Sequence, residues 1–132
     1  IPAERTKMNV EHVVPLTDEA IALLPEPGKP DALVFPGRTR GEPLSDATML
    51  KALRNLRDDD ATVHGLRSTF RTWAGEATDY PREIAEAALG HQVGDDVERA
   101  YARTTFFEKR VKLMEEWATF ATGSRATLSP QP

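Results

Sequence analysis

Three cationic side chains fall on one face of the segment 62–74 if that segment is helical. His64, Arg67 and Arg71 are spaced i, i+3 and i+7, which stacks them along one side of a helix. An arginine presents a fork of N–H donors that matches two oxygens of one phosphate group. The face therefore suits an anion, and phosphate is the first candidate. The alternative is an ordinary solvated basic face.

An apolar stripe on the same segment would anchor these cations. Leu66, Phe70, Trp73 and Ala77 recur at i, i+4, i+7 and i+11, the spacing of a helix surface that faces a core. We expect them to form the core together with Trp117 from an apolar band near the C-terminus. The cationic face would then be held rigidly beside that core.

A glycine–histidine pair and a tyrosine follow further along the chain. Gly90 ends an apolar run in the manner of a helix C-cap, which places His91 at a helix terminus. Tyr101 lies shortly afterwards, in the segment 97–103. The other tyrosine, Tyr80, precedes the glycine–histidine pair.

This ordered set, His-x-x-Arg, then Gly-His, then Tyr, resembles the catalytic domain of the tyrosine recombinases, the phage-integrase family. The resemblance runs from about residue 62 to residue 120 and is close to the prophage-type integrases. It implies an α+β fold that is mostly helical, with a small antiparallel β-hairpin at the N-terminal end. The segments 1–4 and 12–16 read as its two strands, with a polar turn at 5–9 between them. In the family a lysine at such a hairpin tip enters the active site, and Lys7 is the matching residue.

The resemblance also implies the chemistry. Tyr101 would attack a DNA phosphodiester and form a 3′-phosphotyrosyl intermediate, which a second DNA 5′-hydroxyl reverses to rejoin strands. Arg67 would bind a non-bridging oxygen, His64 would assist proton transfer from the tyrosine, and His91 would donate to the phosphoryl group. Lys7 would protonate the leaving oxygen. Because cationic side chains take the role of a metal ion, we expect no cofactor.

Partners follow from the same resemblance. We expect double-stranded DNA attachment sites, other integrase protomers in a recombination synapse, and no membrane. The side chains expected to contact DNA are Arg71, Arg38, Arg40 and Arg103. The formal net charge of −4 counts against nucleic acid, but the distribution of charge matters more than the sum.

The remaining patterns place the other elements. Helices are predicted over 18–24, 46–56 and 79–89, then a short one over 97–103 and a last one from 104 or 105 to about 120. Thr17 and Ser45 are the expected caps of the first two. His12 is assigned no role. The histidines at 12, 64 and 91 lack the spacing of metal ligands and there is no cysteine, so no metal site is predicted.

The 132 residues fit one domain, and the absence of cysteine favours an intracellular compartment. The resemblance implies a cytoplasmic protein encoded by a bacterium or a phage. No apolar run reaches the length of a membrane span, and no signal peptide is visible. The chain begins Ile1-Pro2 without Met. We therefore expect residues 1–122 to be the C-terminal part of the catalytic domain, and 123–132 to be a disordered tail. The family's other active-site arginine would lie upstream, which predicts that this part alone is inactive.

Two further functions remain open from the sequence. One is a non-catalytic DNA-binding or assembly module that keeps the fold. The other is DNA relaxation of the type IB topoisomerase kind, which uses the same nucleophile chemistry.

Overall fold

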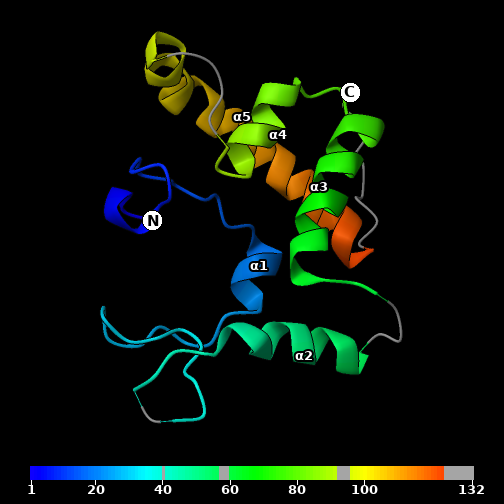
Figure 1. Cartoon of the computed structure of the whole chain (residues 1–132). Helices are drawn as coiled ribbons and strands as arrows, with labels where there is room; N and C mark the ends of the chain where they lie inside the picture. Colours follow the sequence, from blue (N-terminus) through cyan, green and yellow to red (C-terminus); the bar gives the residue numbers. More distant parts are fainter. Residues whose placement is uncertain (40, 57–59, 92–95, 124–132) are drawn as a thin grey trace.

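The computed structural model describes residues 1–39, 41–56, 60–91 and 96–123, with the backbone alone at residue 46 and over 96–105. Within these described ranges, five α-helices and one short 3-10 helix follow one another (Figure 1). Their bounds are η1 Ala3–Arg5, α1 Asp18–Ala22, α2 Asp46–Leu56, α3 Val63–Ala77, α4 Arg82–Ala88 and α5 Asp96–Thr122.

Helix α3 begins where a threonine satisfies its first amides. The Oγ1 of Thr62 accepts a hydrogen bond from the N–H of Gly65 at 2.9 Å. Thr62 is therefore the N-cap residue of α3. Further along the helix Phe70 and Ala74 are buried, with Trp73 packed against them. Leu66, which the sequence places in the core, is 52% exposed, so the buried stripe starts one turn later than predicted.

Helices α4 and α5 close the core over α3. Ile84 and Ala85 of α4 and Leu113 of α5 are nearly inaccessible to solvent. Ala74 of α3 and Ala85 of α4 belong to the same buried cluster. The predicted core role of Trp117 is confirmed, because its ring meets Phe70 edge-on with centroids 5.4 Å apart.

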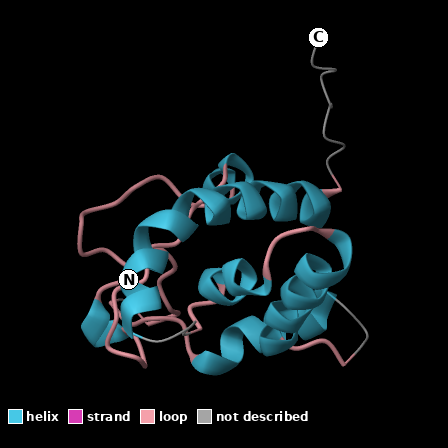
Figure 2. Ribbon diagram, turned by 90° about the horizontal axis from the view of Figure 1, so that it is seen from above, coloured by secondary structure: helices cyan, strands magenta, loops and turns pink. Residues whose placement is uncertain are grey.

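The predicted N-terminal β-hairpin is wrong: the described residues contain no strand, only an isolated bridge between Pro36 and Pro43, and Figure 2 shows helices and loops alone. Ile1 and His12 do exchange two backbone hydrogen bonds, of 2.8 and 2.9 Å, but the pairing goes no further. The fold class is therefore mostly helical rather than α+β.

Local hydrogen bonding explains this outcome. The Oγ1 of Thr6 donates to the carbonyls of Ala3 and Val10 and accepts from the N–H of Val10, so the chain curls where the first strand was expected to end. Pro2 and Pro15 offer no amide to a ladder. A two-stranded ribbon is marginal even without such losses.

The predicted boundary between two C-terminal helices at residues 104 and 105 is also wrong. Helix α5 runs unbroken from Asp96 to Thr122. Residues 96–122 contain neither glycine nor proline, and threonine lowers helix propensity too little to end a helix that is packed on a core.

Helices α1 and α2 lie where the sequence predicts helices, although α1 ends two residues earlier than predicted. The side chain of Thr17 accepts from the N–H of Ala20 at 3.3 Å, so its predicted cap of α1 is confirmed. Helix α2 contacts α3 but contributes no described residue to the core cluster that α3, α4 and α5 form (Figure 1). Met49 and Leu56 of α2 are 54% and 84% exposed.

Candidate functional site

Two of the candidate residues, Arg67 and His91, meet at the C-terminal end of α4. Gly90 has φ +72°, a conformation that costs glycine nothing but strains other residues. Its N–H donates to the carbonyl of Ala87, and the N–H of His91 donates to the carbonyl of Glu86. These two bonds form a Schellman motif. The predicted C-cap is confirmed, and it sets His91 beside the helix end.

Arg67 reaches this end from α3. Its Nη2 donates to the carbonyl of Leu89 at 2.6 Å and lies 3.4 Å from the Nε2 of His91. The family resemblance assigns both side chains to one phosphoryl group, and the structure brings them together. Over the described residues no carboxylate pairs with Arg67, so a fixed and exposed guanidinium keeps its whole charge.

Glu86 contacts the other nitrogen of the His91 ring. No sequence pattern marks this carboxylate as part of a site. Glu86 accepts from the Nε of Arg71 and the Nδ1 of His91, each at 2.6 Å, and from the Nε of Arg82 at 3.4 Å. The hydrogen bond from His91, followed by that from Arg71, lowers the pKa of Glu86 from 4.5 to about 2. Arg71, expected to contact DNA, is thus held by Glu86.

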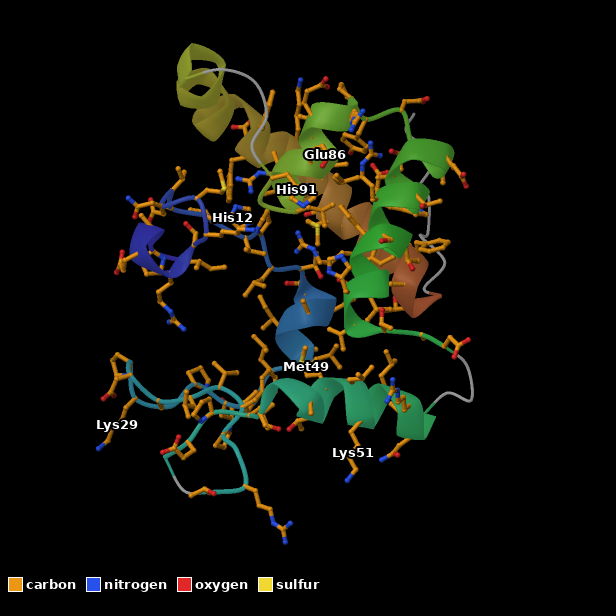
Figure 3. All side chains as sticks on the ribbon, viewed as in Figure 1. His12, Lys29, Met49, Lys51, Glu86 and His91 are labelled. Carbon is orange, nitrogen blue, oxygen red and sulfur yellow. The ribbon has the colours of Figure 1, made fainter. Side chains whose placement is uncertain are left out.

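His12 is a second residue near the site that sequence reasoning missed. Its ring lies 3.6 to 3.7 Å from where a Cβ at Gly90 would be, and Figure 3 shows it near His91 and Glu86. Burial, then the charges of Arg110, the N-terminus and Arg67, lower the pKa of His12. Arg110 of α5, 7% exposed, donates from Nη1 to the carbonyl of Val13, so the adjoining segment is tied to the core. No sequence pattern predicts that His12 lies beside Gly90, because this contact arises from tertiary packing alone.

The other predicted catalytic residues stand apart from this cluster or lie beyond what is described. Lys7 is exposed in the N-terminal loop and contacts neither Arg67 nor His91. His64 is exposed on the first turn of α3, three residues before Arg67, and makes no contact with His91. Tyr101 lies on α5, and its side chain falls outside the described residues.

The remaining predicted DNA contacts are less constrained. Arg38 is exposed in the loop between the bridged Pro36 and Pro43. Arg40 and the side chain of Arg103 lie outside the described residues, as do residues 124–132 of the tail predicted over 123–132. These assignments stay predictions.

The described part of the chain contains neither a membrane-spanning helix nor a cluster of metal-binding side chains. No helix there is long and apolar enough to cross a membrane. No group of three or more His, Cys, Asp or Glu side chains there is arranged to hold a metal ion.

Comparison with known proteins identifies the family. The sequence model of the Phage integrase family matches residues 1–108, so the chain belongs to that family. It is 40% identical over 124 residues to the prophage integrase IntA of Escherichia coli K12 and 35% identical over 122 residues to the prophage integrase IntZ of the same strain. It is 31% identical over 122 residues to the integrase of Enterobacteria phage P4.

These matches cover 89%, 89% and 86% of this chain but only 30%, 30% and 28% of the relatives. The chain therefore spans about three tenths of their length. No solved structure matches the chain.

Proposed function

We propose that this chain is the part of a tyrosine recombinase that cuts and rejoins double-stranded DNA at attachment sites of a mobile element. The observation that carries the proposal is the juxtaposition of Arg67 and His91, 3.4 Å apart, on an exposed surface where no described carboxylate neutralises the guanidinium. Such a fixed cation beside an imidazole suits a phosphoryl oxygen that gains charge in the transition state. The family membership supplies the reaction class.

Tyr101 is the proposed nucleophile. Its oxygen attacks phosphorus, the bond from phosphorus to the 5′-oxygen breaks, and Lys7 gives a proton to that leaving oxygen. His64 takes the phenol proton, while Arg67 and His91 bind the phosphoryl oxygens. The 3′-phosphotyrosyl bond keeps the energy of the broken bond, so a second 5′-hydroxyl can restore the DNA strand.

The chain's other tyrosine supports this assignment by its environment. Tyr80 donates its phenol hydrogen to the Oε1 of Glu116 at 2.8 Å. Burial, then this hydrogen bond and the charges of Glu116 and Glu115, raise the pKa of Tyr80 to about 12. A phenol that resists ionisation and faces a carboxylate is a poor nucleophile for a phosphodiester.

The test is covalent capture on DNA. The full-length gene product is incubated with nicked DNA that spans the boundary between the mobile element and its host. We expect wild type and Tyr80→Phe to form a protein–DNA adduct and Tyr101→Phe to form none. An adduct with Tyr101→Phe would show that the nucleophile is misassigned.

The proposal includes a limit on the chain by itself. The family resemblance requires a second active-site arginine ahead of the lysine, and no arginine of this chain stands in that context. Losing one charged donor from an organised anion site costs on the order of 10²–10³ in rate. The 132-residue chain should therefore form the adduct far more slowly than the full-length product in the same assay.

A further inference from the structure

Glu86 accepts hydrogen bonds from both the side chain and the backbone of His91. Its Oε2 accepts from the Nδ1 of His91 at 2.6 Å, and its backbone carbonyl accepts from the His91 N–H at 2.9 Å. Its Oε1 is held by Arg71 of α3 at 2.6 Å, and the whole side chain is 19% exposed. The carboxylate is therefore fixed from α3 and fixes the imidazole in turn.

The two neighbours of the His91 ring determine where its proton lies. An ionised carboxylate only accepts hydrogen bonds, so the Nδ1 that faces Glu86 must carry a hydrogen. A guanidinium only donates, and the Nη2 of Arg67 lies 3.4 Å from Nε2. A neutral ring then offers Arg67 a lone pair at Nε2. The two contacts are independent of each other and assign the same tautomer.

We propose that Glu86 is a positioning residue that keeps the proton of neutral His91 on Nδ1 and leaves Nε2 as an acceptor beside Arg67. This inference rests on the proposed function, because it concerns the group that would face the phosphoryl oxygen. The neutral ring accepts at Nε2 and cannot donate there. Donation to a phosphoryl oxygen requires the imidazolium, which forms when Nε2 gains a proton while Nδ1–H stays on Glu86.

Several charged groups face this pair and enter any pH dependence. Arg67 and Arg71 contact it from α3, and Arg82 contacts it from α4. His12 of the N-terminal segment lies against Gly90 next to His91. The arginines keep their charge throughout the range in which an imidazole titrates, so a change of profile near neutral pH reports on the imidazoles.

The direct test reads the tautomer without any DNA. In ¹⁵N-labelled 132-residue chain, the couplings of the His91 ring nitrogens to the ring protons distinguish Nδ1–H from Nε2–H. The resonances are assigned with His91→Asn. We expect the neutral ring of wild type to carry its proton on Nδ1, and a neutral ring protonated on Nε2 would overturn the inference.

Variants separate Glu86 from its surroundings. In Glu86→Gln the amide NH₂ can donate to Nδ1, so we expect the Nε2–H tautomer to appear. Arg71→Gln removes the support from α3 but leaves the carboxylate, and Glu83→Gln removes an exposed carboxylate of the same helix. Both should keep Nδ1–H. An unchanged tautomer in Glu86→Gln would contradict the positioning role.

Cleavage by the full-length gene product supplies the functional readout. Wild type should lose cleavage as the pH rises through the imidazole range, because only the imidazolium donates. In the Glu86→Gln variant the neutral ring of His91 can donate from Nε2. This variant should therefore keep its residual cleavage to higher pH. Identical profiles would overturn the role of Glu86 in donation. Absence of cleavage in wild type would instead overturn the proposed function, and the tautomer result would stand.

Discussion

Replacing Glu86 by glutamine removes a negative charge on which Arg71, Arg82 and His91 converge, while keeping the shape of the side chain. The pKa of Glu86 falls from 4.5 to about 2 on folding, chiefly through the hydrogen bonds from His91 and Arg71. One pKa unit corresponds to about 1.4 kcal/mol, which sets an upper limit of about 3 kcal/mol on the lost stability. Because the side chains of Arg82 and His91 are 75% and 52% exposed, solvent screens part of this. We expect Glu86→Gln to lower the free energy of unfolding by about 1–2 kcal/mol at pH 6.

The pH dependence of that difference identifies its cause. Since the folded-state pKa is depressed, the stabilisation is fully present above the unfolded-state value of 4.5 and is lost as the pH falls toward about 2. Below 4.5 the unfolded chain takes up a proton that the folded chain does not. The gap between wild type and Glu86→Gln should therefore shrink steadily between about pH 5 and pH 2.

Urea unfolding of the 132-residue chain, followed by tryptophan fluorescence at a series of pH values, measures the gap. Trp73 and Trp117 lie in the core and report on global unfolding. Glu83→Gln, an exposed carboxylate of the same helix, is the matched control and should change stability by no more than about 0.5 kcal/mol. A gap for Glu86→Gln that stays constant from pH 6 to pH 2.5 would refute the electrostatic account.

Two other predictions concern the turn at His91 and the need for metal. Gly90→Ala should lower the free energy of unfolding by about 1–2 kcal/mol, because φ +72° is strained for alanine, and it should move the His91 ring resonances; an equally stable variant with unchanged resonances would contradict this. Cleavage by the full-length product should survive excess EDTA, since Arg67 and Lys7 take the part of a metal's charge; loss that Mg²⁺ or Zn²⁺ restores would refute the metal-free scheme.

Features set by a few neighbouring residues could be predicted from the sequence. Gly90 and Thr17 act as caps because their own backbone and side-chain chemistry suits a helix end, and the structure confirms both. The meeting of Arg67 with His91 was predicted from the order of the family's motifs. It required only that α3 and α4 pack side by side, which their apolar faces favour.

Features that depend on distant contacts could not be predicted. The segments 1–4 and 12–16 suggest two strands, but Thr6 satisfies backbone groups locally and Arg110 binds the carbonyl of Val13 from 97 residues away. His12 sits beside Gly90 for the same tertiary reason. Glu86 reads as one more polar residue on a helix, and nothing in its spacing shows that an arginine and a histidine converge on it.

The way Arg67 is held bears directly on what the site can bind. The last carbonyls of a helix have no partner within the helix. At the end of α4, residues of the candidate site donate hydrogen bonds to two of these carbonyls. The His91 N–H donates to the carbonyl of Glu86, and the Arg67 side chain donates to the carbonyl of Leu89. A carboxylate could orient Arg67 equally well but would cancel its charge. A backbone carbonyl fixes the guanidinium and leaves the charge for an incoming anion. The carboxylate of Glu86 acts instead through the far side of His91, where it orients the ring without neutralising Arg67.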